Sequence, residues 1–139
     1  MGTNVYMQRI PTESELNEIK ANIDKLDFQK ASELMEKYRS EVHIGKRSGG
    51  WQFLFAPNPE YYEETRESID KFLHRKDWEL VTEYYDYITP EDFWQDFVED
   101  FKDGYSHESY IQAHPMEDRW PSLEHYSDGL RFSNSKDFA

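Results

Sequence analysis

Two short runs of β-prone residues, Val42 to Ile44 and Trp51 to Phe55, are joined by a stretch rich in glycine and cations, His43-Ile44-Gly45-Lys46-Arg47-Ser48-Gly49-Gly50-Trp51. Glycine is favoured where the backbone must adopt a positive φ or approach another group closely. Pro57 ends the second run, because proline has no N–H to donate to a sheet. The pattern predicts a β-hairpin with a long cationic loop over residues 45–50, and so a fold that contains a sheet.

Helical patterns lie on both sides of this hairpin. Thr12 and Glu15 have the spacing of a capping box, and apolar residues recur at helical spacing as far as residue 39. Two short helices, or one bent helix, would carry on one side Leu16, Ile19, Ile23, Leu26, Phe28, Ala31, Leu34, Met35 and Tyr38. A further helix is predicted over residues 60–75, and a strand from Trp78 to about Tyr84.

The sequence Thr89-Pro90-Glu91-Asp92 indicates the start of another helix, with threonine at the cap, proline at the first position and acids in the first turn. An aromatic stripe follows, which we interpret as core: Phe93, Trp94, Phe97 and Phe101. After Gly104 no period is sustained. Residues 126–132 resemble a small hairpin around the Asp128-Gly129 turn.

The composition fits one domain with an aromatic-rich core. The 139 residues suffice for a single core, and 17% of them are aromatic. The chain has no cysteine and hence no disulfide, and neither a membrane-spanning run nor a signal-peptide pattern is present. We therefore expect a cytoplasmic, single compact α+β domain over residues 1–139. It would contain N-terminal helices (1–40), an α/β central part (41–103) with a small, mainly antiparallel sheet and two further helices, and an irregular, acidic, loop-rich tail with a terminal hairpin (104–139).

The net charge of −13 is confined to one part of the chain. Between Asp77 and Asp128 there are fifteen acidic residues and only two basic ones, whereas acids and bases balance elsewhere. Such acidity opposes binding to a phosphate backbone and favours a basic partner surface. Side chains three or four apart on a helix lie about 5–6 Å from each other, a spacing that can imitate a row of phosphates. The candidate partner-binding set is Glu91, Asp92, Asp96, Glu99, Asp100 and Asp103. A solvated helix face without a partner is the alternative.

The glycine-containing stretch is a second candidate site, for a small anion. Successive backbone amides in a glycine-rich turn can hold an anion, and two cations add charge. The candidate ligand-binding set is His43, Gly45, Lys46, Arg47, Ser48, Gly49, Gly50 and Trp51. A nucleotide-binding P-loop is excluded, because Ser40 stands where that motif needs glycine and a strand follows where it needs a helix. A purely structural turn is the competing interpretation.

The positions of the histidines in the sequence do not indicate a catalytic site or a metal site. His43 has no partner carboxylate that the sequence identifies, so we assign no catalytic residue. The tail contains atoms that zinc accepts, but at no spacing typical of a ligand pair: His107, His114 and His125, with Glu108, Glu117 and Asp118. We expect no bound metal and no cofactor.

The stretch from His43 to Trp51 resembles the signature His-x-Gly-Lys-x-Ser-x-Gly-Trp of a family of small, uncharacterised bacteriophage and prophage proteins. The similarity continues more loosely through residues 77–81, 88–94 and the Asp-Gly element before Phe132. Arg47 departs from the family pattern, where a small residue is expected, and the helical run before residue 41 has no counterpart. That family has no established activity, so the resemblance implies a phage context and the host cytoplasm, and it does not imply a reaction.

These observations predict a phage-encoded accessory protein that acts by binding rather than by catalysis. It would inhibit a host protein with a basic surface, such as a defence or nucleic-acid-handling protein, through its acidic residues. Direct binding to nucleic-acid backbones or to membranes is not expected. Two alternatives remain open: a small-ligand or nucleotide-binding module, with or without enzymatic activity, that uses residues 43–51, and a structural component of the virion.

Overall fold

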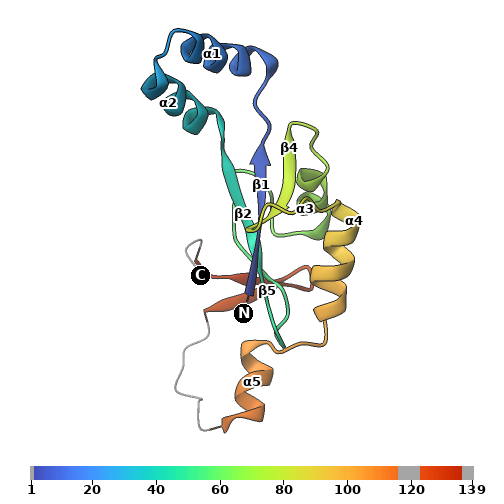
Figure 1. The fold of residues 1–139 in the computed structure, drawn as a ribbon. Coiled ribbons are helices and arrows are strands. Elements are labelled where there is room, and N and C mark those ends of the chain that lie inside the picture. Colours follow the sequence, from blue (N-terminus) through green and yellow to red (C-terminus); the bar gives the residue numbers. More distant parts are fainter. Residues whose placement is uncertain (1, 116–122, 136–139) are drawn as a thin grey trace.

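The computed structural model describes residues 2–115 and 123–135. The elements are, in chain order, β1 (Gly2–Arg9), α1 (Glu13–Asp24), α2 (Phe28–Tyr38), β2 (Glu41–Ser48), β3 (Leu54–Phe55), α3 (Arg66–Leu73), β4 (Trp78–Thr82), α4 (Pro90–Phe93), the π-helix η1 (Trp94–Val98), the 3-10 helix η2 (Glu99–Phe101), α5 (His107–Ala113), β5 (Glu124–Ser127) and β6 (Leu130–Ser133). They form the expected α+β fold around one six-stranded sheet of order β4-β1-β2-β3-β6-β5 (Figure 1).

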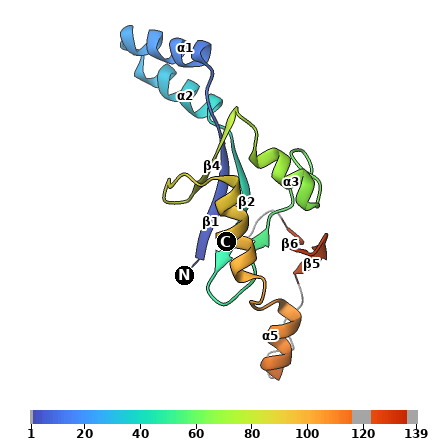
Figure 2. The same ribbon diagram turned by 90° about the vertical axis from the view of Figure 1, so that its right-hand side faces the viewer.

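The sheet is mainly antiparallel, as predicted, with one parallel pair between β3 and β6. The parallel pair joins segments that are far apart in the sequence, with Phe55 opposite Phe132. Helices α3 and α4 lie on one side of the sheet (Figures 1 and 2). The main core fills the space between that side and these helices.

Aromatic side chains supply much of this core, which confirms the role predicted for the stripe after Pro90. Phe55, Phe93 and Phe132 come from three distant segments and are at most 1% exposed. The Phe55 ring lies 6.1 Å from that of Phe93 and 5.3 Å from that of Phe132. Trp94 and Phe97 are also buried, whereas Phe101 is only half-buried.

Strand β1 is the largest difference from the sequence prediction, which treated residues 1–40 as helical. It pairs with both β2 and β4, so it lies inside the sheet. Val5 and Met7 are fully buried and their neighbours are less so, which is the two-residue period of a strand. Two apolar residues at that period are a weak local signal, and the strand gains its stability from partners distant in sequence.

The predicted N-terminal helices are α1 and α2, which form a helical hairpin beyond the end of the sheet (Figures 1 and 2). The predicted Thr12 cap is present, since Thr12 Oγ1 accepts from the N–H of Glu15, and Asp27 caps α2, since its Oδ1 accepts from the N–H of Lys30. The hairpin buries a small core of its own, consisting of Ile19, Ala31 and Leu34. Most of the remaining apolar side chains predicted to share one helix side are exposed.

The predicted β2–β3 hairpin is confirmed, but both strands have different bounds from those predicted. Strand β3 is only Leu54–Phe55, whereas the pattern predicted a strand from Trp51 to Phe55. Strand β2 continues to Ser48, so residues 45–48 are strand and not loop. Gly45 pairs with Phe55 on one side and with Val5 of β1 on the other. Pairing with β1, which the sequence analysis did not anticipate, supplies the backbone partners that extend β2 through the glycine. The positive φ of +80° falls on Gly50, in the turn itself.

The remaining predicted elements are present, with different bounds. Strand β4 ends at Thr82 rather than near Tyr84. Helix α3 begins at Arg66 rather than near residue 60, because the Thr65 side chain caps it. Residues after Gly104 are not simply irregular, since they include α5. The terminal hairpin is present as β5 and β6, and its turn residues Asp128 and Gly129 both have positive φ. This geometry is that of the type I′ turn favoured by Asp-Gly.

Candidate functional site

Five of the six acidic candidates lie on one continuous helical segment, residues 90–101, whose opposite side is anchored in the core, and Asp103 lies in the turn that follows. Thr89 Oγ1 accepts from the N–H of Asp92 at 3.1 Å, and Pro90 occupies the first turn, as predicted. Phe93 and Phe97 stack with their ring centroids 5.9 Å apart. The indole Nε1 of Trp94 donates to Asp70 Oδ1 of α3 at 2.8 Å. These contacts fix the rotation of the segment, so its acidic side faces solvent.

The middle of this segment, Trp94–Val98, is a π-helix rather than an α-helix. The wider turn shifts every later side chain around the axis, so a regular i, i+4 spacing of the acids does not apply beyond it. The sequence-based prediction that these carboxylates form one row at α-helical spacing is therefore wrong beyond residue 94. Asp92, Asp96, Asp100 and Asp103 are nevertheless all exposed.

Two of the six candidate acids have cationic partners within the protein. Arg66 Nη1 lies 2.7 Å from Glu99 Oε1, and His74 Nε2 lies 3.1 Å from Glu91 Oε1. Asp92, Asp96 and Asp103 take part in no ion pair within residues 2–115 and 123–135. The acidity available to a partner is thus concentrated on these aspartates and Asp100, which accepts from Gln95.

His74 connects helix α3 to the acidic segment. Its Nδ1 lies 2.8 Å from the carbonyl oxygen of Asp70, and its Nε2 contacts Glu91. The Asp70 carbonyl and then the Glu91 carboxylate raise the pKa of His74 above its usual value. The pKa of Glu91 is lowered, first by its own backbone N–H and then by His74. This end of the segment therefore loses part of its negative charge when His74 is protonated.

Two arginines flank the segment and lie over its aromatic rings. The Arg66 guanidinium is 4.4 Å from the centroid of Trp94, and that of Arg47 is 4.1 Å from the centroid of Phe97. Arg47 also donates to the carbonyl oxygen of Asp96 at 3.5 Å. Such stacking holds each guanidinium beside a ring, and that of Arg66 also pairs with the carboxylate of Glu99. Neither contact can be predicted from the sequence, because Arg47 and Arg66 lie far from residues 90–101 along the chain.

The anion-site candidates divide between the two sides of strand β2. Arg47 lies against the acidic segment, whereas Lys46, Ser48 and Trp51 border a separate hollow of about 180 Å³. Leu54 and Arg131 complete the lining of that hollow. Arg131 was not a predicted site residue, and no local signal identifies it, because β6 reaches β3 only through the parallel pairing.

Arg131 is held mainly by contacts inside the protein. Its Nε pairs with Glu124, its Nη1 donates to the carbonyl oxygen of Gln52 at 2.8 Å, and its guanidinium lies 5.1 Å from the Trp51 ring centroid. These contacts already occupy much of its hydrogen-bonding capacity. The hollow thus offers an anion chiefly the Lys46 ammonium group and the Ser48 hydroxyl.

His43 sits on the sheet and makes contacts typical of a structural residue. Its Nε2 lies 2.9 Å from Asn4 Oδ1, and its ring stacks on that of Tyr6 at 4.9 Å. Asn58 Nδ2 donates to the His43 carbonyl oxygen. Burial lowers the pKa of His43, which keeps the ring neutral near pH 7.

The tail histidines are separated by the fold. His125 lies between Glu64 Oε1 and Asn134 Oδ1, at 2.5 and 2.6 Å, and these contacts raise its pKa. His114 instead stacks on Tyr110. No group of three or more potential metal ligands occurs within the described ranges. Glu117 and Asp118, which completed the sequence-based set, lie outside them.

Across the same described ranges, no helix is both long and apolar enough to traverse a bilayer. Comparisons of the chain with models of protein families, with curated proteins and with solved structures gave no match.

Proposed function

We propose that this protein is a phage-encoded accessory protein that inhibits a host protein by binding its basic surface. The observation that carries the proposal is the presentation of three exposed aspartates, Asp92, Asp96 and Asp100, on a helical segment anchored by buried aromatic rings, with the exposed Asp103 in the turn that follows. A fixed surface loses little conformational entropy on binding, which favours affinity. The phage context rests on the resemblance of residues 43–51 to the phage signature.

Electrostatics defines the class of partner. Because residues 90–103 carry six acids and only one base, Lys102, this surface complements a protein surface rich in lysine and arginine, such as a nucleic-acid groove. The acids paired within the protein, Glu91 and Glu99, contribute less to such binding, since an ion pair partly cancels their field. The proposal therefore assigns the main contacts to the unpaired aspartates.

The test is quantitative affinity capture from a bacterial host lysate. The test variant combines Asp92→Lys, Asp96→Lys and Asp103→Lys, and the control combines Glu63→Lys, Asp86→Lys and Glu108→Lys, which changes the charge equally at exposed sites elsewhere. We expect the wild type and the control to retain the same partner. We expect the test variant to lose at least about tenfold in affinity, equivalent to roughly 1.4 kcal/mol.

Salt provides a second measurement with the same proteins. Binding by the wild type should fall steeply as ionic strength rises, because exposed charges are screened over about 10 Å at 0.1 M salt. Circular dichroism of each variant establishes that it is folded. Retention of the partner by the folded test variant, at unchanged salt dependence, would contradict the proposal.

A further inference from the structure

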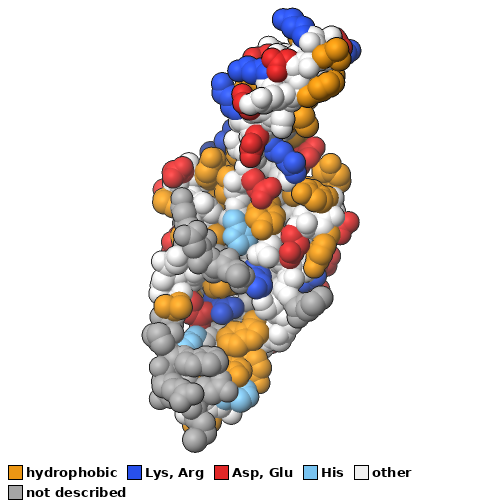
Figure 3. All heavy atoms as spheres, turned by 60° about the vertical axis from the view of Figure 1, so that its left-hand side comes forward, with side chains coloured by type: hydrophobic (Ala, Val, Ile, Leu, Met, Phe, Trp, Pro, Cys, Tyr) orange, Lys and Arg blue, Asp and Glu red, His pale blue; other side chains and the backbone are white. Residues whose placement is uncertain are grey.

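The helical hairpin formed by α1 and α2 exposes a set of large apolar side chains that its own small core does not cover. The exposed fractions are 51% for Leu16, 43% for Ile23, 73% for Leu26, 61% for Phe28 and 55% for Met35. Figure 3 shows hydrophobic side chains gathered on this part of the molecule. Contiguous apolar surface of this kind marks a site of association.

The apolar residues of the hairpin, the buried Ile19 and Ala31 among them, follow the spacing of a coiled-coil seam on both helices. On α1 and the turn after it, the positions 16, 19, 23 and 26 are separated by three, four and three residues. On α2, the positions 28, 31, 35 and 38 repeat the same separations. A hairpin uses such seams fully when a second hairpin packs against it to form a four-helix bundle. Here the hairpin alone buries only Ile19, Ala31 and Leu34.

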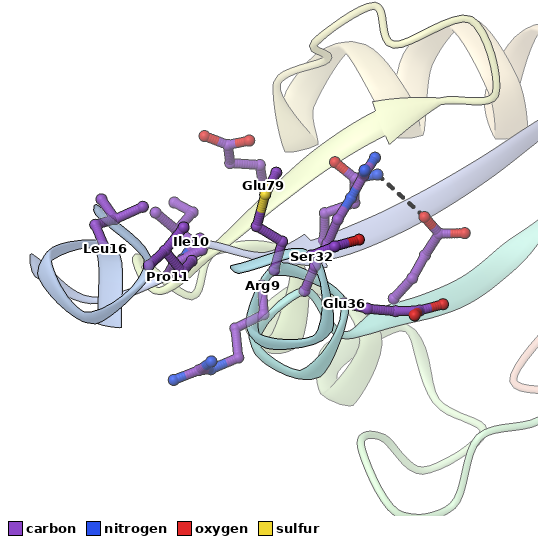
Figure 4. Close-up of a pocket in the computed structure, with 12 residues that line it drawn as sticks. Arg9, Ile10, Pro11, Leu16, Ser32, Glu36 and Glu79 are labelled. Carbon is purple, nitrogen blue, oxygen red and sulfur yellow. Dashed lines mark hydrogen bonds between the residues drawn. The ribbon is translucent and has the colours of Figure 1, made fainter. Parts of the chain in front are cut away.

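A groove opens at the base of the hairpin, where it meets the sheet (Figure 4). Its volume is about 740 Å³, and its apolar lining includes Ile10, Pro11, Leu16 and Met35. Leu26 and Phe28 lie at the opposite end of the hairpin, in the turn between the helices and the first turn of α2. One end of the hairpin thus offers apolar side chains, and the other end offers a groove with a partly apolar lining.

The charge distribution favours a second copy of the chain as the occupant. Residues 12–39 contain seven acids and five bases, so the hairpin is close to neutral, whereas the acidic excess lies between Asp77 and Asp128. Two copies with a net charge of −13 each repel one another through their bodies, and least through their hairpins. The rim of the groove carries both signs, including Arg39 and Glu36, which suits a self-complementary contact.

We propose that two copies of this protein associate through their α1–α2 hairpins in an antiparallel arrangement related by a two-fold axis. Leu26 and Phe28 of each copy then pack into the groove of the other, beside Leu16 and Met35. The contact is isologous, so it closes as a dimer and does not propagate. Its driving force is burial of apolar surface.

The test is the mass of the full chain by sedimentation equilibrium and light scattering over a range of concentrations. We expect a dimer, with twice the chain mass of 16.8 kDa, that dissociates on dilution. The variant combining Leu26→Asn and Phe28→Glu should be monomeric at concentrations where the wild type is dimeric. A matched control, Tyr84→Asn with Tyr87→Glu, changes two exposed aromatic residues of the body and should remain dimeric.

The two test substitutions are compatible with the local backbone, so we expect the variant chain to fold. Leu26 has a φ of +62°, which asparagine tolerates better than leucine, and Phe28 is the first residue of α2, where glutamate interacts well with the helix dipole. Loss of the dimer by a folded variant therefore reports on the contact itself. A wild type that stays monomeric at every concentration, or a test variant that stays dimeric, would overturn the proposal.

The orientation has its own test, since the chain contains no cysteine. A Leu26→Cys chain mixed with a Met35→Cys chain should form a disulfide between the two different chains under oxidation. Preferential bridging of Leu26→Cys chains to each other would overturn the antiparallel arrangement. Unlike the acidic surface, this contact should persist at high salt, so failure of either proposal can be recognised separately.

Discussion

At the scale of single residues, Gly45 is a position in the glycine-rich stretch whose identity the packing requires. A Cβ atom there would lie 2.5 Å from Phe53 Cε1 and closer still to the carbonyl oxygen of Leu54. Both neighbours are buried or part of the sheet, so neither can move freely. Gly49, four residues later, has no atom within 4 Å of the corresponding position. The same residue type therefore serves different purposes at the two sites.

We predict that Gly45→Ala lowers the free energy of unfolding by about 1–3 kcal/mol, the usual cost of overpacking a core. Gly49→Ala is the matched control and should change it by less than about 0.5 kcal/mol, as exposed substitutions usually do. Urea denaturation of the two variants measures the difference. Equal midpoints for both would show that the sheet accommodates the added methyl group.

His43 illustrates how burial changes a titration. Its pKa is lowered in the folded protein, chiefly by desolvation, whereas in the unfolded chain it has the ordinary value of about 6.5. As the pH falls below that value, the unfolded chain binds the proton before the folded protein does. The folded state consequently loses stability on the acid side of about pH 6.5.

We predict that His43→Gln, which cannot titrate, flattens this acid-side loss in unfolding experiments at a series of pH values. His74 and His125 act in the opposite direction, because their raised pKa values add stability at low pH that is lost as the pH rises through those values. Ring-proton titration by NMR separates the three. A His43 pKa at or above 6.5 would contradict the assignment.

At the scale of elements, the helical hairpin and the sheet differ in how they are stabilised. Helices α1 and α2 contact each other and bury three residues, whereas β1, β2 and β4 lie over the main core. Arg9 ties the base of the hairpin to the sheet, through Glu15 and the carbonyl oxygen of Tyr38. Small cores open at lower free energies than large ones.

We predict that backbone amides of α1 and α2 exchange with solvent faster than those of β1 and β2 in a dilute, monomeric sample. Raising the protein concentration should slow exchange in the hairpin selectively, because dimerisation would cover it. Hydrogen exchange followed by mass spectrometry measures both effects. Equal protection of hairpin and sheet in dilute solution would show that the protein opens as one unit.

Elements fixed by local chemistry were predictable from the sequence, and elements fixed by distant pairing were not. The caps at Thr12, Asp27 and Thr89 and the Asp128-Gly129 turn act over a few residues, so their residue types identify them. Strand β1 and the β3–β6 pair depend on partners elsewhere in the chain. Five of the six acidic candidates are exposed, as their polar positions indicate, but the half-burial of Glu99 and the pairing of Glu99 with Arg66 and of Glu91 with His74 depend on the fold.

At the scale of the whole molecule, the two proposed surfaces lie on different parts of the chain and would bind by different interactions, one hydrophobic and the other electrostatic. The hairpin is nearly neutral and apolar, and the segment after Thr89 is acidic. A dimer would carry two copies of the acidic surface. When a partner offers two basic sites within reach, the second contact becomes intramolecular and the overall affinity rises without any new contact.

The β3–β6 pairing also governs when the fold can be completed during synthesis. Strand β3 has only two residues and pairs with β6 along one edge, yet β6 leaves the ribosome much later than β3. Until then Phe55 lacks its neighbour Phe132, and that edge of the sheet is open. The nascent chain therefore carries an unfinished sheet until β6 has been synthesised, and Leu130 and Phe132 of β6 then join the core.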